Sequence, residues 1–532
     1  MLRRLLEKSG ESAFLRAVLT HPLGLVLIPA LLGAIASIGQ APYLKWPLTL
    51  AALIFLFFIL SLLSLKRQLF TVTLSFFTAY NALTLWWLNF VMEGFGALPA
   101  ALSISVVLLF SVYLSLPYAL LTLLAFRIAG HHTIAFNLSF LPLTFTLSDF
   151  LIGYLLSGFP WTFAGYGFTD SPFAAFAPLI GVRGMNFLIY ITAGAVSLTI
   201  MRQFIYLPVA GFIVIAGVLT MGIRYTEPSE ERIPLTLVQG NIAQSVKWRS
   251  DMVGPTLATY WELSEEALHQ GRTVIWPESA IPLYIEDAFP LLEDLNAVVR
   301  EHDSCLVSGI QHRFTENGTR RATNSILVLD GSDLEAATQK RYDKRHLVPF
   351  GEYVPLEKTL RPLGSIFNFP MSAFAEGPSD QSSLHVGSLT LNPAICYETV
   401  FPELMLSLDS PEVNGILMLS NDSWFGPTRG PLEHLNIARL RAMEMQKPLI
   451  RVTNSGVTAL IDAAGRVSQE LKRDVPAVLN VDFTPYTGQT PYARFSFLPL
   501  LLLLILNALW GAYSLKHGLN PTQQALLKLL RP

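Results

Sequence analysis

The sequence predicts a polytopic α-helical membrane protein that carries a separate α/β domain outside the cytoplasm. Of its 532 residues, 52% are hydrophobic and 14% are charged, and the mean hydropathy is +0.44. A soluble globular protein has about 25% charged residues. The charges are also unevenly distributed, since residues 225–490 contain 22 of the 37 Lys and Arg and 34 of the 39 Asp and Glu. That segment has the composition of an acidic soluble domain, and the rest of the chain does not.

The overall composition also excludes several classes of protein. The apolar content is too high for a disordered or collagen-like chain, and two cysteines are too few for a disulfide-rich scaffold. A formal net charge of −2 argues against a nucleic-acid-binding protein.

The charge-poor half contains eight apolar segments that are candidate membrane spans. A helix needs about 20 largely apolar residues to cross roughly 30 Å of hydrocarbon. The candidates are residues 22–38, 47–65, 69–91, 99–125, 134–157, 185–201, 206–223 and 495–513. The first is short and contains Pro22 and Pro29, although Pro22 lies at its start, where proline is tolerated. We expect no cleaved signal peptide, because many spans follow.

Lys and Arg in the short loops predict which ends of the spans face the cytoplasm. Eleven of these residues fall on the side of the two termini, and two, Lys45 and Arg183, fall on the other side. Both termini are therefore predicted to be cytoplasmic. Seven spans precede the acidic segment, so that segment is predicted to lie outside the cytoplasm. The predicted domains are residues 1–224 with about seven spans, residues 225–490, and residues 491–532 with the last span and a cytoplasmic tail.

The acidic segment alternates between strand-like and helix-like stretches, which predicts sheets covered by helices. The strand-like runs are residues 234–242, 273–279, 305–314, 323–330, 388–398, 415–422, 448–456 and 457–465. The helix-like stretches are residues 252–270, 287–302, 399–409 and 433–446. Residues 347–378 are rich in Pro, Gly and Phe and predict a long structured loop, which in a compact domain is usually functional or mobile.

Two charged residues of this domain lie near predicted turns, Glu278 after an apolar strand and Lys344 just before the Pro- and Gly-rich loop. Glu278 stands after an apolar run in VIWPESAIP, where an acidic residue is commonly a solvated turn residue or a helix cap. Lys344 stands in YDKRHLVPFGEYVP. A solvated charge cluster is the plain interpretation there, but the apolar, turn-rich stretch that follows would draw these charges toward a cleft.

Cys396 ends an apolar strand in LTLNPAICYETVFPEL, and a helix is predicted to begin within about three residues. A thiol at such a turn is exposed at the sheet edge, and a nearby helix N-terminus can lower its pKa. This is the geometry of an activated nucleophile. The alternatives are a buried small hydrophobe, which suits Cys305 well, and a Cys305–Cys396 disulfide, which two strand positions disfavour.

Together, a glutamate, a lysine and a cysteine supply the roles that acyl transfer needs. A cysteine needs a base to remove its proton, and a carboxylate can serve if desolvation raises its pKa. Attack on an ester or amide builds an oxyanion, which an ammonium and a backbone N–H stabilise.

These three positions resemble the Glu–Lys–Cys triad of the nitrilase superfamily. Further motifs accompany the predicted spans, namely SGFPWTFAGYGF, QGNIAQSVKW, WPESAIP, KRHLVPFGEYVP, ICYETVFPE, SNDSWFG and RVTNSG. With them, the chain resembles the apolipoprotein N-acyltransferase family of bacterial inner membranes over nearly its whole length. The resemblance implies a nitrilase-like α-β-β-α sandwich on the periplasmic side of the cell inner membrane.

The resemblance also implies a reaction, the last step of lipoprotein maturation. The family transfers an acyl chain from a membrane phospholipid to the enzyme cysteine as a thioester, in a ping-pong mechanism. It then passes the chain to the N-terminal S-diacylglyceryl cysteine of an apolipoprotein. By resemblance, Glu278 is the general base, Lys344 stabilises the oxyanion and Cys396 is the nucleophile. Phospholipid, apolipoprotein and the bilayer are the expected partners of a monomer, with no nucleic acid.

Three further residues are candidates for supporting roles. Glu352 matches a second glutamate near the triad in this family and can hold Lys344 or its neighbours by charge-assisted hydrogen bonds, or it merely caps a turn. The backbone N–H of Tyr397 is a candidate oxyanion donor, and Glu398 is a candidate structural residue. We expect no cofactor and no metal, because no Cys/His cluster has zinc spacing and no phosphate-binding glycine loop is present.

Aromatic residues on predicted loops suit an interfacial lid or an acyl-chain wall, although packing on the domain core is an equal alternative. The candidates are Trp248, Phe367, Phe369, Trp424 and Phe425. Asp149 lies inside a candidate span, where a carboxylate is either functional or a polar contact between helices.

Two other functions compete with acyl transfer. A membrane-tethered amidase or nitrilase would share the triad and use water as the acceptor. A transporter with an extracytoplasmic receptor domain would need paired polar groups within the spans, where Asp149 is nearly alone.

Overall fold

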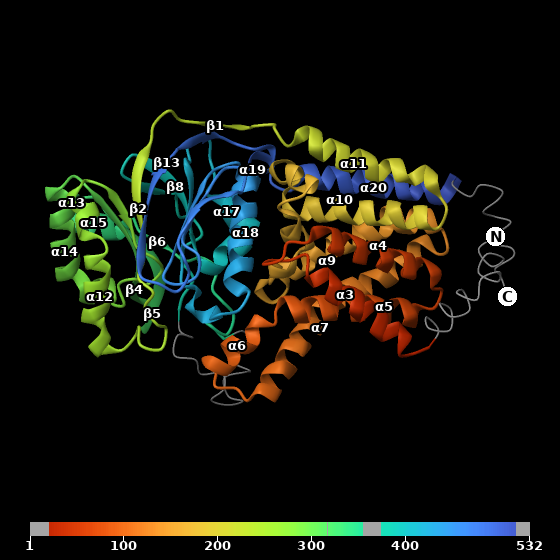
Figure 1. Ribbon diagram of the computed structural model, residues 1–532, viewed down its shortest axis with the longest axis horizontal. Helices are drawn as coiled ribbons and strands as arrows, with labels where there is room; N and C mark the ends of the chain where they lie inside the picture. The colour runs from red at the N-terminus through yellow and green to blue at the C-terminus, as the bar shows by residue number, and fades with distance from the viewer. Residues whose placement is uncertain (1–20, 317, 355–373, 518–532) are drawn as a thin grey trace. The chain divides into compact units, whose positions relative to one another are not determined.

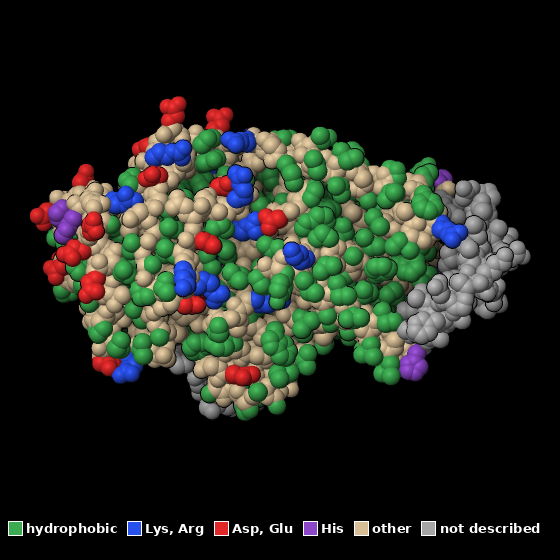
Figure 2. Space-filling view, viewed as in Figure 1, with side chains coloured by type: hydrophobic (Ala, Val, Ile, Leu, Met, Phe, Trp, Pro, Cys, Tyr) green, Lys and Arg blue, Asp and Glu red, His purple; other side chains and the backbone are tan. Residues whose placement is uncertain are grey.

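The computed structural model describes residues 21–316, 318–354 and 374–517 (Figure 1). These residues form two compact units. The first unit is made of residues from 21–89, 99–222 and 497–517, and the second of residues from 90–98 and 223–496. In Figure 2, hydrophobic side chains cover the visible surface of the first unit, whereas acidic and basic side chains gather over the second.

Each of the eight predicted spans overlaps with a helix. The helices are α3 (Gly24–Ser37), α4 (Trp46–Leu62), α5 (Lys66–Thr84), α6 (Trp87–Gly94), α7 (Ala100–Ala129), α8 (Thr133–Ala135), α9 (Leu141–Tyr154), α10 (Ala177–Ile200), α11 (Leu207–Thr220) and α20 (Leu498–His517). Among the described residues, four helical stretches are long and apolar enough to cross a membrane, namely 100–129, 133–157, 172–200 and 498–517. The pair α5 and α6, bent by 56°, makes a fifth if it is one span. The count of eight stays a prediction, because α3, α4 and residues 204–220 form shorter apolar helices.

The placement of Arg183 in a connecting loop was wrong. Arg183 lies inside α10 and is buried, because this helix begins at Ala177, before the predicted span. Its guanidinium carbon lies 4.7 Å from the ring centre of Phe150 and 5.4 Å from that of Phe163. Aromatic faces attract a cation, so they compensate for the burial of this charge, and hydropathy alone gives no sign of them.

Asp149 forms a polar contact between three helices of the first unit. This buried side chain of α9 accepts hydrogen bonds from the Tyr118 hydroxyl on α7 and from Asn186 and Tyr190 on α10, at 2.8 Å from Asn186 Nδ2. Buried polar groups of this kind are stable when they are hydrogen-bonded. The structure therefore shows Asp149 in the helix-linking arrangement that was one of its two interpretations.

The second unit contains two six-stranded sheets in its described residues. The first sheet has the order β13 (Ala477–Phe483), β2 (Ile233–Gln239), β3 (Thr273–Ile275), β4 (Cys305–Glu316), β5 (Thr319–Leu329) and β6 (Tyr342–Asp343). The second has the order β12 (Val467–Glu470), β11 (Ala459–Ile461), β10 (Leu449–Thr453), β9 (Gly415–Ser420), β8 (Leu389–Ile395) and β7 (Leu384–Val386). A short ribbon pairs β1 (Thr226–Pro228) with β14 (Tyr486–Gly488). Strands β2 to β4 are parallel, and so are β8 to β10.

The two sheets pack face to face and each is covered by helices on its outer face. One apolar core contains inward residues of both sheets, such as Leu237 and Val307 from the first and Leu417 and Ile450 from the second. The first sheet packs outward on α12 (Val253–Glu262), α13 (Glu265–His269), α14 (Ile285–Glu301) and α15 (Leu334–Gln339). The second packs outward on α17 (Pro402–Ser407) and α18 (Gly430–Met445). The expected α-β-β-α sandwich is thus confirmed.

Candidate active site

Glu278, Lys344 and Cys396 each follow the end of a strand, which the sequence predicted for Glu278 and Cys396 but not for Lys344. Glu278 comes three residues after β3, Lys344 directly follows β6, and Cys396 directly follows β8. Glu278 and Lys344 are buried, and Cys396 is partly buried. The strands belong to both sheets, so the sandwich itself brings the three side chains to one place.

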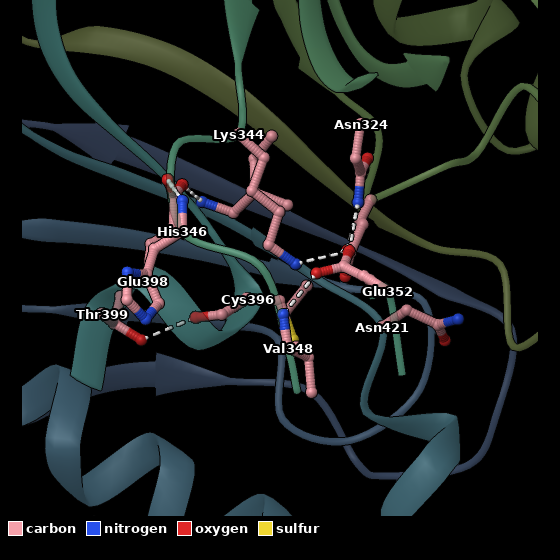
Figure 3. Close-up of polar contacts among 12 residues, drawn as sticks. Asn324, Lys344, His346, Val348, Glu352, Cys396, Glu398, Thr399 and Asn421 are labelled. Atoms are coloured by element: carbon pink, nitrogen blue, oxygen red, sulfur yellow. Dashed lines mark hydrogen bonds and ion pairs between the residues drawn. The ribbon is translucent and has the colours of Figure 1, made fainter. Parts of the chain in front are cut away.

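A network of hydrogen bonds holds the two carboxylates against the lysine (Figure 3). Lys344 Nζ lies 2.7 Å from Glu352 Oε1 and 3.8 Å from Glu278 Oε1. Asn324 Nδ2 donates to Glu278 Oε1 at 2.7 Å, and the Val348 N–H donates to Glu352 Oε2 at 2.8 Å. Glu352 is therefore an anchor for the ammonium group and not only the cap of a turn.

The Glu278 carboxyl and the Lys344 ammonium have shifted pKa values. Burial raises the pKa of Glu278 above its ordinary value, Glu352 adds to this, and Lys344 opposes it. Burial alone would lower the pKa of Lys344, but the Glu352 and Glu278 carboxylates raise it above its ordinary value. The lysine therefore keeps its positive charge, while the glutamate gains the proton affinity that a general base requires.

The expectation that a helix N-terminus lowers the pKa of Cys396 was wrong. Burial raises the pKa of this thiol, the Glu278 carboxylate raises it further, and Lys344 opposes both. The element that follows is the short 3-10 helix η10 (Cys396–Val400), whose dipole offers little compensation. The resting group is therefore a thiol, which needs a base to become nucleophilic.

The backbone at Cys396 is strained. Its φ angle is +52°, in the left-handed region that non-glycine residues rarely adopt. Holding such a residue there costs on the order of 1 kcal/mol or more, so the surrounding structure must stabilise it.

Glu398 connects the cysteine turn to the lysine segment. One of its oxygens accepts a hydrogen bond from the Ile395 N–H at 2.8 Å, and the other accepts from the Arg345 N–H at 2.7 Å and the Tyr342 hydroxyl at 2.9 Å. This buried carboxylate thus fixes the residues next to Cys396 and Lys344 together. Tyr397 is also buried, and its ring packs edge-on against Phe401.

The residues predicted to contact lipid differ in how far they are exposed. Trp248 is 38% exposed. Trp424 makes an edge-to-face contact with Phe95, with ring centres 4.7 Å apart. Phe425, in contrast, is buried and packs against His434, which matches the alternative of packing on the domain core and not lipid contact. The two remaining candidates, Phe367 and Phe369, lie outside the described residues.

Several polar residues of the site were missed at the sequence level. Asn324 lies within β5, where it was taken as part of an ordinary strand, yet it donates to Glu278. Lys247 is fully buried and donates from Nζ to the Glu278 backbone oxygen at 3.0 Å. Burial lowers the pKa of Lys247 to about 8, against the effect of Glu278. Its only signal in the sequence was one basic residue in QGNIAQSVKW.

Cys305 is a core residue, and the described part of the chain contains no candidate metal site. Cys305 is free and buried at the start of β4, which matches its interpretation as a small hydrophobe, and Cys396 is also free. Across the described residues, no group of three or more His, Cys, Asp and Glu side chains is suited to holding a metal ion.

Comparison with known proteins gives matches along most of the chain. The family model for the carbon–nitrogen hydrolase domain matches residues 235–492, and the model for the N-terminal domain of apolipoprotein N-acyltransferase matches residues 32–195. The apolipoprotein N-acyltransferase of Shewanella oneidensis is 35% identical over 90% of this chain and 93% of the relative. That of Vibrio cholerae is 34% identical over 93% of this chain and 98% of the relative.

Among solved structures, an amidase of the nitrilase superfamily from Nesterenkonia has a TM-score of 0.37 at 19% identity. It aligns with 52% of this chain and 98% of its own. The NitFhit protein of C. elegans has a TM-score of 0.38 at 16% identity and aligns with 51% of this chain and 65% of its own.

The second unit defines the class of protein, a carbon–nitrogen hydrolase-type domain joined to apolar helices. With relatives 34–35% identical over nine-tenths of its length, the chain belongs to the apolipoprotein N-acyltransferase family.

Proposed function

We propose that this protein transfers an acyl chain from a membrane phospholipid to the α-amino group of the N-terminal S-diacylglyceryl cysteine of an apolipoprotein. The observation that carries the proposal is the close grouping of Glu278, Lys344 and Cys396 in a chain of this family. The relatives carry the name of the same activity. As the last step of lipoprotein maturation, the reaction joins two substrates that both reside in the membrane.

In the first half-reaction, Glu278 takes the proton of the Cys396 thiol as the sulfur attacks the ester carbonyl of the phospholipid. The carbonyl oxygen becomes negative, and the Lys344 ammonium and the Tyr397 N–H stabilise it. The ester C–O bond then breaks, and the protonated Glu278 returns the proton to the departing lysophospholipid oxygen. A thioester at Cys396 remains.

In the second half-reaction, the α-amino group of the acceptor attacks this thioester. Glu278 removes a proton from the nitrogen, the same donors stabilise the oxyanion, and the C–S bond breaks. The sulfur recovers a proton from Glu278, so the enzyme returns to its starting state with an amide formed. One base therefore serves both half-reactions of a ping-pong mechanism.

Two carboxylates support this chemistry without reacting. Glu352 holds the Lys344 ammonium at 2.7 Å, and Glu398 holds the peptides next to Lys344 and Cys396. Such charge-assisted hydrogen bonds keep the oxyanion donor and the nucleophile aligned before the substrate arrives.

We further propose the arrangement in the membrane that the sequence predicts. Eight spans anchor a monomer in the inner membrane with both termini cytoplasmic, and residues 225–490 lie in the periplasm. The domains are then residues 1–224, 225–490 and 491–532. The apolar helices of the first unit and the charged surface of the second support this division. In this arrangement Trp248, Trp424, Phe367 and Phe369 contact lipid.

A labelled acyl chain tests the proposal. Purified full-length protein is incubated with vesicles of phospholipid that carries the labelled chain, and the Cys396 peptide is analysed by mass spectrometry. We expect an acyl thioester that persists in water and is discharged by a diacylated lipopeptide with a free α-amino group. Rapid discharge by water alone would instead support a hydrolase, and absence of any adduct would overturn both functions.

The pH dependence of thioester formation reports the state of Glu278. The base must be ionised, and burial raises the pKa of Glu278 above the ordinary value of about 4.3. We therefore expect the single-turnover rate to fall on acidification at a higher pH than a solvated glutamate would give. In Lys247→Met this acidic limb moves to still higher pH, because the ammonium favours the charged carboxylate.

The exposed Lys340→Met is the matched control, and its pH profile stays that of the wild type. A limb that stays in place or moves to lower pH in Lys247→Met contradicts the assignment of the limb to Glu278.

A further inference from the structure

The carbonyl oxygen of Cys396 is held by two side chains. Thr399 Oγ1 donates to it at 2.8 Å from within the same turn, and His434 Nε2 lies 3.1 Å from it. His434 comes from α18, which packs against the outer face of the second sheet. A residue 38 positions away thus reaches the peptide of the strained nucleophile.

His434 is part of a buried charged network. Its Nδ1 atom lies 3.1 Å from Asp422 Oδ1, and Arg451 Nη2 donates to Asp422 Oδ2 at 2.7 Å. Ser420 Oγ donates to Asp422 Oδ1 at 2.8 Å. All four side chains are at most 1% exposed. Burial opposes the charge of Asp422, but Arg451 and His434 hold the pKa of its carboxyl well below the usual range.

One end of this network contacts the backbone of Cys396. Nδ1 of His434 meets Asp422 and lies 3.3 Å from Arg451 Nη2, while Nε2 faces the carbonyl oxygen of Cys396. Since a carbonyl oxygen only accepts, a hydrogen bond here requires a proton on Nε2, which also lies 3.2 Å from the Thr399 hydroxyl oxygen. The ring orientation is fixed from behind by Asp422, in the way a second residue orients a histidine in many sites.

We propose that His434 is a positioning residue, which fixes the Cys396 peptide in the orientation that the thiol needs to react. Asp422 and Arg451 act through it by fixing the ring. The left-handed φ of Cys396 is the strain that this contact offsets. Loss of the donor lets the peptide relax, and the sulfur then departs from its place beside Glu278 and Lys344.

Two variants of similar size test this inference, which rests on the proposed function. His434→Gln keeps an N–H donor in reach of the carbonyl oxygen, whereas His434→Met keeps only bulk. In single-turnover thioester formation with phospholipid vesicles, we expect His434→Met to lower the rate constant about 10- to 100-fold. We expect His434→Gln to lower it less than about fivefold. The apparent KM for the phospholipid stays unchanged in both.

The rate constant and the amplitude of thioester formation distinguish an effect on the position of Cys396 from an effect on folding. The rate constant reports the folded protein, and the amplitude reports the fraction that is folded. Leu440→Ala, a buried residue of the same helix, is the control, and it lowers the amplitude or the melting temperature without slowing the folded fraction. Equal slowing in Gln and Met variants, or a wild-type rate constant in both, would overturn the proposal. If the Met variant does not fold, more than tenfold slowing in His434→Gln overturns it.

Alkylation of Cys396 by iodoacetamide at pH 9 gives a readout that needs no acyl substrate. We expect the alkylation rate of His434→Met to differ more from that of the wild type than the alkylation rate of His434→Gln does. If the wild type forms no thioester, the proposed function fails, and the alkylation rates still decide the role of His434: unchanged rates in both variants reject it.

Discussion

Replacing Cys396 with alanine is expected to abolish both thioester formation and acyl transfer. In the proposed mechanism the Cys396 sulfur is the atom that bonds to the acyl chain. Removal of a catalytic nucleophile typically costs at least about 10³-fold in kcat. Cys396→Ser is expected to fail as well, because the less acidic hydroxyl is a poorer nucleophile beside a carboxylate base. Transfer of a labelled acyl chain to a diacylated lipopeptide measures the effect.

Cys305→Ala is the matched control for this experiment. Cys305 is the other cysteine of the chain, and it is buried in β4 with its pKa raised by burial to about 12. Its truncation removes a small apolar contact in the core, so we expect a modest loss of stability and near-normal transfer. An alanine variant at Cys396 that still transfers the acyl chain would refute the nucleophile assignment.

Glu278→Gln is expected to stop thioester formation while the domain stays folded. Glutamine has nearly the same shape and can still contact Asn324 and Lys344, but it cannot take a proton at neutral pH. Because the Cys396 thiol rests protonated, loss of the base leaves it a poor nucleophile. General-base catalysis contributes about 10²- to 10⁴-fold, and we expect a loss in that range. Single-turnover acylation followed by mass spectrometry measures it.

The exposed Glu293→Gln on α14 serves as the control and should acylate at the wild-type rate. Circular dichroism and the melting temperature show whether Glu278→Gln is folded. Normal acylation in a folded Glu278→Gln would exclude this residue as the base, and the pH profile would then belong to another group.

The sequence predicted the buried part of the fold and missed the edges of the sheets. Continuous apolar runs mark strands that are covered on both faces, and the central strands β2 to β5 and β8 to β10 were found in this way. Edge strands β12 and β13 were missed, because most of their residues are partly or fully exposed and give no such run. The other two edge strands, β6 and β7, are mostly buried and were missed because they are only two and three residues long. An apolar run in the sequence indicates that a strand is buried, and it does not indicate which strand it pairs with.

Within the site, Glu278 and Cys396 were found at the ends of predicted apolar strands, and Lys344 was found in a charge cluster before the Pro- and Gly-rich loop. Such patterns are visible in the sequence alone. The groups behind these three residues are not. Asn324, Lys247 and His434 come from other elements, and only the folded chain brings them to the site. For the same reason the pKa of Cys396 was predicted with the wrong sign, since burial is a property of the assembled sandwich.

The raised pKa of the Cys396 thiol has a consequence for the durability of the protein. Oxidants attack the thiolate and not the thiol, so a cysteine that stays protonated at neutral pH reacts slowly with peroxide and forms sulfenic acid slowly. Enzymes with permanently ionised cysteines lack this protection. In the proposed mechanism the sulfur becomes reactive only as Glu278 takes its proton during attack on the substrate, so we expect little irreversible oxidation of Cys396 between turnovers.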